Sequence, residues 1–460
     1  MAEVSRLNEL DKAPVGKLLW KYSVPAVVGI VIMSIYNVID RIFIGQGVGH
    51  EAIAGLAITF PVMNISAAFG VLIGVGASAR ISIVLGMGNR RMADLILGNS
   101  IVMTLIFGTF YIAMMGIFMT PILRLFGATD AALPYARDFM MFILPGLLMN
   151  NLCYSYNNVM RVSGYPTKAM VTMFIGAGLN VILAPIFIFG FGWGIKGAAI
   201  ATDISMGTSA LFVMLHFMNK KHELHFKRGT FHLDWRILGP ILGIGAAPCI
   251  VNTAGCIVNA VINNTVAYYG AQLGQGMAEM AVASIGIFTT IIQLIITFVI
   301  GVCQGMQPIV GYNYGARKFS RLKRAFWLSA AVCTAICVIG TLLCAFIPET
   351  LSRMFTSHDR LIEISSKTLR LTTIMFWGAG FQIVATNFFQ SIGQVGKSIF
   401  MSLTRQVLFL IPLLLFLPEL LGLEGVWLAF PISDAAALIA AIVLVIIQMR
   451  SINTLARQSA

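Results

Sequence analysis

Long apolar runs and short polar breaks alternate along the whole chain. The first run begins near Leu18 and continues for roughly 27 residues. Runs of about 20 residues or more are long enough for a helix to cross the ~30 Å hydrocarbon layer of a bilayer. Run length, together with the Gly, Pro and charged breaks, predicts twelve transmembrane helices, near residues 18–45, 52–85, 92–119, 135–160, 167–190, 195–218, 237–269, 280–312, 322–346, 366–390, 397–417 and 425–449.

The composition fits an all-α integral membrane protein. Of the 460 residues, 58% are hydrophobic and 11% are charged, and the mean hydropathy is +0.87. A soluble protein needs more polar residues to cover its surface. The first run lacks a small-residue cleavage pattern, so we expect it to stay as the first helix and not to be removed as a signal peptide.

The basic residues orient the chain in the membrane. An even number of helices places both termini on one side, and the segments on that side hold 22 of the 31 Lys and Arg residues, Arg161 and Arg405 among them. The positive-inside rule therefore predicts cytoplasmic termini. It also accounts for most of the net charge of +13, so we expect no nucleic-acid partner.

The chain contains an internal repeat on either side of a polar segment. VPAVVGIVIMSIYNVIDR aligns with APCIVNTAGCIVNAVINN at an offset of 223 residues, which pairs Asp40 with Asn263. Near-constant offsets over half a chain indicate a duplicated unit. We predict an N-terminal lobe (1–218), a cytoplasmic linker (219–236) and a C-terminal lobe (237–460). Six helices per lobe make the repeats parallel and relate them by a pseudo-twofold axis along the membrane normal, a transporter architecture.

Two motifs carry a family resemblance. GMQPIVGYNYGARKFSRLKRA (305–325) and MRVSGYPTK (160–168), within the twelve-helix duplication, resemble the multidrug and toxic compound extrusion (MATE) family. The resemblance implies a multidrug efflux antiporter that exports amphipathic, mostly cationic compounds by alternating access, in exchange for H⁺ or, alternatively, Na⁺. It also implies a monomer in the bacterial cytoplasmic membrane that contacts organic cations and lipid and needs no cofactor or metal.

The resemblance also implies a site for the coupling ion. The proton-coupled prokaryotic branch has an acid late in the first helix with a Tyr four residues before it, and Asp40 and Tyr36 match both. Asn180 matches an Asn of the fifth helix, and Thr202 a Thr of the sixth. The second acid of the family site is missing, because Ala184 stands at its position.

Two further points bear on coupling. Asp203 follows Thr202, and we hypothesise that it partly replaces the carboxylate lost at Ala184. The Na⁺-coupled branch uses acids in the second lobe, but no Asp or Glu occurs between Asp234 and Glu279. Proton coupling through Asp40 is therefore favoured, and Na⁺ at the first-lobe site stays open.

Polar and thioether side chains near these positions are candidates for a substrate cavity. Met173 lies seven residues before Asn180, and Met206 lies four after Thr202. Flexible thioethers suit a surface that accepts many ligand shapes. Asn37 and Asn157 join them as candidates, although buried amides also hydrogen-bond between membrane helices.

Other functions remain open. A two-lobed cavity also serves a lipid or lipid-linked oligosaccharide flippase, and fold alone does not decide the substrate. Flippase relatives tend to have basic cavities, whereas the candidates here are acidic or amide. A membrane-embedded enzyme needs a nucleophile with its base or a metal cluster, and neither is apparent. Asp434, a further intramembrane acid, is expected to make a structural hydrogen bond to a facing helix.

Overall fold

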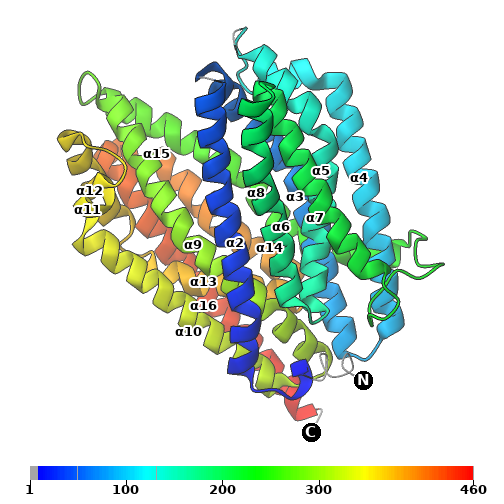
Figure 1. The fold of residues 1–460 in the computed structure, drawn as a ribbon. Coiled ribbons are helices and arrows are strands. Elements are labelled where there is room, and N and C mark those ends of the chain that lie inside the picture. Colours follow the sequence, from blue (N-terminus) through cyan, green and yellow to red (C-terminus); the bar gives the residue numbers. More distant parts are fainter. Residues whose placement is uncertain (1–8, 49, 131, 459–460) are drawn as a thin grey trace.

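The computed structural model describes residues 9–48, 50–130 and 132–458, and these residues form helices joined by loops, without a strand (Figure 1). This confirms the predicted all-α fold. The helical elements are α2 (Val15–Gly47), α3 (His50–Gly86), α4 (Arg90–Leu125), α5 (Leu133–Val162), α6 (Pro166–Pro185), η1 (Ile186–Gly190), α7 (Gly194–Met218), α8 (Trp235–Ala271), α9 (Met277–Gly315), α10 (Phe319–Phe346), α11 (Pro348–Arg353), α12 (Asp359–Thr372), α13 (Trp377–Ser391), α14 (Val395–Leu403), η2 (Thr404–Leu410), α15 (Ile411–Leu421) and α16 (Leu423–Gln458).

Each of the twelve predicted spans coincides with a helix or with consecutive helical elements. The span predicted near 366–390 is divided into α12 and α13 by a turn at residues 373–376. Within the described residues, ten spans are long and apolar enough by themselves to cross a membrane. The other two are α5, which carries several charged and amide residues, and the divided pair α12 and α13.

Apolar side chains cover the outer surface of the bundle. Ile117 is 73% exposed, Phe346 78% and Leu420 81%. Apolar exposure of this extent on long helices is expected where lipid, and not water, surrounds the protein.

The two ends of the described chain lie at the same end of the bundle (Figure 1). Arg321 donates hydrogen bonds to the carbonyls of Leu10 (3.0 Å) and Ala13 (2.6 Å). Lys323, two residues further along α10, bonds to Asn453 near the end of α16. We call this the terminus end and the opposite one the far end. An even number of spans requires this arrangement.

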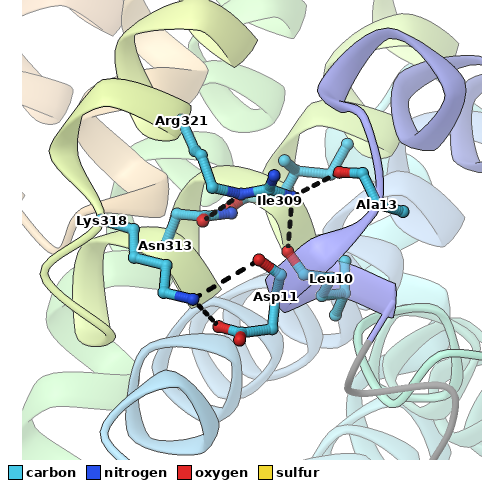
Figure 2. Close-up of polar contacts among 7 residues, drawn as sticks. All are labelled: Leu10, Asp11, Ala13, Ile309, Asn313, Lys318 and Arg321. Carbon is cyan, nitrogen blue, oxygen red and sulfur yellow. Dashed lines mark hydrogen bonds and ion pairs between the residues drawn. The ribbon is translucent and has the colours of Figure 1, made fainter.

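A polar cluster fastens the start of the chain to the α9–α10 corner (Figure 2). Besides its two bonds to carbonyls, Arg321 donates from Nε to Asn313 (3.1 Å). Lys318 forms an ion pair with Asp11 (2.6 Å). We name these contacts of residues 10–13 with Asn313, Lys318 and Arg321 the terminal clasp. Asn313, Lys318 and Arg321 all belong to the 305–325 motif.

We name α2 to α7 the first lobe and α8 to α16 the second lobe, following the sequence repeat. The lobes touch along a seam where backbones approach closely. A Cβ on Gly245 of α8 would lie 1.7 Å from the Leu72 carbonyl oxygen of α3, and one on Gly76 would lie 2.0 Å from that of Ile241. Gln307 of α9 also donates to Ser78 of α3 (3.1 Å). The seam lies in the terminus-end halves of these helices, so the lobes are joined there.

The segment between α7 and α8 packs on the first lobe. Asn99 of α4 donates to the carbonyl of Thr230 (3.2 Å) and accepts from the backbone N–H of Asp234 (3.0 Å). Lys227 pairs with the buried Asp94 at 2.5 Å. The polar composition of this segment predicts a solvated linker, but its hydrogen bonds and its ion pair hold it against α4.

Candidate functional site

Four of the residues expected at the coupling site lie together in the first lobe. The amide nitrogen of Asn180 donates to the hydroxyl of Thr202 (2.9 Å), and that hydroxyl donates to the carbonyl of Ala198 one turn before it (2.9 Å). Tyr36 is buried and lies beside Thr202 and Asp40. Helices α2, α6 and α7 thus each contribute to one polar cluster.

Two oxygen acceptors of this cluster are unsatisfied. Within the described part of the chain, Oδ1 of Asp40 and Oδ1 of Asn180 are buried and have no hydrogen-bond partner. Buried acceptors are nearly always paired, and exceptions often mark a functional site or an ion. A proton on Asp40, or a cation beside it, would satisfy such groups.

Arg41, next to Asp40, faces elsewhere. It is exposed, and its guanidinium lies over the Phe60 ring at 5.4 Å from the centroid. Successive residues of a helix point about 100° apart. The Asp40 carboxylate therefore faces the polar cluster, whereas the Arg41 guanidinium lies at the exposed surface.

Asp203 is not brought into the Asn180–Thr202 contact. It faces α5, where a Cβ on Gly146 would lie 1.9 Å from its Oδ1. Its Oδ1 is also buried without a partner among the residues described. Ala184 is fully buried in an apolar cluster of the first lobe, with Ala198 and Ala201 among its members. The structure therefore places Asp203 on another side of α7 from the coupling cluster.

A cavity of about 290 Å³ opens beside the cluster, and we name it the first-lobe cavity. Tyr36, Thr202, Asn157, Met173 and Met206 all line it. Its other lining residues come from α2, α5, α6, α7 and α9. Five of the nine residues expected at the coupling site or the substrate cavity thus share one cavity.

The remaining expected residues lie outside that lining. Asp40, Asn180 and Asp203 pack among the helices and do not line the cavity, and Asn37 is exposed. Met173 reaches its place because Gly29 of α2 leaves room: a Cβ there would lie 2.4 Å from the Met173 sulfur.

Arg161 lines the same cavity and was not among the expected residues. It is 3% exposed and donates to Gln304 of α9 (2.6 Å), Asn158 (3.2 Å) and Asn157 (2.9 Å). Because Arg161 stands next to a predicted loop, it was predicted to lie with the basic residues of the cytoplasmic side. Its bond to Gln304 joins the first lobe to the second.

A second cavity, of about 580 Å³, lies between the lobes, and we name it the central cavity. Amide side chains dominate its lining, among them Asn64, Asn252, Gln293, Gln307, Gln382 and Gln390. A signal for it exists in the sequence: Gln293, Gln304 and Gln307 are spaced by eleven and three residues, which puts them on one face of α9.

A third cavity, of about 780 Å³, is lined by α8, α9, α10 and η2 together with parts of α2, α11 and α16. Arg405 borders it and the central cavity. Its Nε donates to Oδ1 of Asp434 at 2.6 Å, which confirms the predicted hydrogen bond of Asp434 to a facing element. Among the described residues, no group of three or more His, Cys, Asp or Glu side chains could hold a metal ion.

Comparisons with known proteins agree on one family. The family model described as MatE matches residues 25–186 and 271–415. The multidrug export protein MepA of Staphylococcus aureus is 27% identical over 96% of this chain and 95% of its own length. A protein of Shewanella oneidensis described as an FAD transporter is 29% identical over 92% of this chain and 93% of its own.

A solved structure extends the likeness to three dimensions. It is described as the outward-facing conformation of a multidrug resistance MATE family transporter. It superposes with a TM-score of 0.89 at 25% identity, covering 96% of this chain and 98% of the other.

Proposed function

This chain belongs to the MATE family of multidrug efflux transporters, which are membrane transporters and not enzymes, and we propose that it exports amphipathic, mostly cationic organic compounds in exchange for protons. Asp40 is the residue that takes up and releases the proton. Tyr36, Asn180 and Thr202 hold the local arrangement around it.

The unsatisfied Oδ1 of Asp40 supports this proposal most directly. An acid within a membrane helix generally faces a cavity and marks an ion pathway. Tyr36 lies beside Asp40 and also lines the first-lobe cavity, so protonation at Asp40 acts on the cavity wall through one side chain. Drug and proton then compete, because each binds one state of the same site better.

The rest of the proposal follows from the sequence. The transporter works as a monomer in the bacterial cytoplasmic membrane, with the terminus end in the cytoplasm, and it needs no cofactor. Alternating access separates the lobes at the seam and the terminal clasp, and closes them at the far end. Na⁺ is the alternative coupling ion at the same first-lobe site.

Purified protein in liposomes tests the coupling. With H⁺ and Na⁺ gradients imposed separately, the H⁺ gradient drives transport of a cationic dye, Asp40→Asn abolishes it, and Asp40→Glu retains part of it. Asp138→Asn is the matched control, since Asp138 lies on α5 and pairs with Lys196 at a half-exposed position. Equal dye transport by Asp40→Asn and the parent would refute the proton role of Asp40.

The hypothesis that Asp203 assists Asp40 has its own test. We expect Asp203→Asn to shift the pH dependence of dye transport, because a second buried acid would then be lost from the first lobe. An unchanged transport rate and pH profile would discard this role.

A lipid flippase is the second candidate function. The sequence led us to expect only acidic or amide side chains in the cavities, but Arg161 and Arg405 line them, and a basic lining suits acidic headgroups. A fluorescent-lipid translocation assay in the same liposomes separates the two: a flippase moves the labelled lipid, and a drug exporter moves only the dye.

A further inference from the structure

We propose that Arg161 forms an anion subsite in the first-lobe cavity, which binds a carboxylate or phosphate group of an otherwise apolar cargo. The inference rests on the proposed function, since it assumes that this cavity holds the transported compound. It extends the cargo from the cationic compounds of the proposed function to molecules that carry a carboxylate or phosphate group.

Among the residues that the structure describes, no acid forms an ion pair with Arg161 or lines the cavity beside it. Its guanidinium is buried, and its three side-chain hydrogen bonds go to the neutral amides of Asn157, Asn158 and Gln304. Of the residues that line this cavity, none is Asp or Glu, and Arg161 is the only Lys or Arg. A buried charge is strongly unfavourable unless an opposite charge accompanies it. An anionic ligand would supply that charge.

The guanidinium also has donors to spare. An arginine carries five N–H groups in a planar fork, and the amide bonds of Arg161 use three of them, two from Nη1 and one from Nη2. The N–H of Nε and one N–H of Nη2 remain without a partner among the described residues. Such a fork matches the paired oxygens of a carboxylate or phosphate better than a lysine does.

The rest of the lining suits the apolar body of such a ligand. Ile30, Met33, Met173, Met206 and Ile300 face the same space as Arg161. A volume of about 290 Å³ is at the small end for ligand pockets. The cavity therefore fits an acid with one or two rings.

Asp40 does not oppose an anion in this position. Asp40 is absent from the cavity lining, whereas Tyr36, which lies beside Asp40, is part of it. An acid bound at Arg161 therefore meets no Asp or Glu side chain in the cavity lining. Arg405 offers no equivalent subsite, because Asp434 already pairs with its guanidinium.

A matched ligand pair tests the charge. Binding of 2-naphthoate and of 2-naphthamide is measured by calorimetry on the full-length protein in lipid nanodiscs. We expect naphthoate to bind at least tenfold more tightly than the amide. Arg161→Gln should weaken naphthoate binding tenfold or more and leave the amide unchanged, and Arg161→Lys should fall between. Arg137→Gln is the control, since Arg137 is exposed on the same helix.

A second variant keeps Arg161 but pairs its guanidinium with an acid of the protein, so that it no longer binds a ligand anion. Gln304→Glu places a carboxylate at a position now 2.6 Å from the guanidinium, so it should abolish naphthoate binding while the protein stays folded. Naphthyl phosphate and a short-chain phosphatidic acid distinguish a soluble acid from a lipid headgroup as the natural source. Preference for either one supports the anion subsite and identifies its source.

Three results would overturn the inference: equal affinity of the parent for naphthoate and naphthamide, equal loss of both ligands in Arg161→Gln, or undiminished naphthoate binding in Gln304→Glu. Cationic dye transport in liposomes is measured alongside. If the dye is transported but naphthoate does not bind, only the anion subsite fails. If the H⁺ gradient drives no transport of dye or acid, the proposed function fails.

Discussion

The terminal clasp should stabilise the state in which the lobes are joined at the terminus end. Arg321→Ala removes its two hydrogen bonds to the carbonyls of Leu10 and Ala13, of 3.0 and 2.6 Å. Hydrogen bonds from a charged donor contribute roughly 1.5–3 kcal/mol each when buried. Arg321 is only half-buried, so we take about 1 kcal/mol for each, or about 2 kcal/mol in all.

A loss of about 2 kcal/mol changes the ratio of the two conformations roughly 30-fold. We therefore expect Arg321→Ala to raise the population that is open at the terminus end by about this factor. This population would be measured by double electron–electron resonance, from the distance between spin labels at Lys220 and Arg450 in a cysteine-free background. Both positions are exposed. Arg450 belongs to α16 of the second lobe, and Lys220 to the segment that packs on the first lobe.

The control is Lys323→Ala. Lys323 bonds to Asn453 within the second lobe, so its loss should leave the distance distribution unchanged. The reasoning is refuted if Arg321→Ala leaves the distribution as it is in the parent, or if Lys323→Ala shifts it equally.

Three further changes have defined outcomes. Thr202→Val removes the acceptor of the α6 amide and should lower the melting temperature, at a loss of about 1–3 kcal/mol, and reduce H⁺-driven dye transport. Gly245→Ala forces a methyl group against the α3 backbone and should weaken the seam by about 1–3 kcal/mol, seen as a wider label distance; Gly239→Ala, with open space around it, should not. Lys227→Met leaves the buried Asp94 carboxylate unpaired and should lower the melting temperature, which a second change, Asp94→Asn, should largely restore.

The positions of the helices could be predicted from sequence because membrane spans follow from apolar length alone. The division of the 366–390 span could not, because the turn at Thr373–Phe376 contains neither Gly nor Pro. The π-helical segments η1 and η2 were not predicted either. Pro185 directly precedes η1 and Pro412 closely follows η2, and a proline removes a donor from the helical hydrogen bonds.

The candidate site was predictable where a motif fixed the positions. Tyr36, Asp40, Asn180 and Thr202 were expected together and lie together. The structure does not bring Asp203 into this cluster, because successive residues of a helix point about 100° apart and its side chain turns to α5. That Asp203 assists Asp40 stays a prediction.

Arg161 was missed for a different reason. Its nearness to a loop suggested a solvated charge, whereas the end of α5 contacts α9 and the Arg161 side chain reaches Gln304. Only the packing of one lobe on the other reveals this, and a single sequence does not contain it. The amide face of α9, by contrast, could have been found from spacing alone.

The fastening of residues 219–234 to the first lobe has a mechanical consequence. Asn99 binds the last residue of this segment, Asp234. The part of the chain that passes from the first lobe to the second without such contacts is therefore limited to the first turns of α8. Any rotation of the lobes then has its covalent pivot within a few residues of Trp235, close to where α8 meets α3. Because this pivot lies near the seam, the far end is the part of the bundle most distant from it. A small rotation at Gly245 therefore produces a large displacement at the far end.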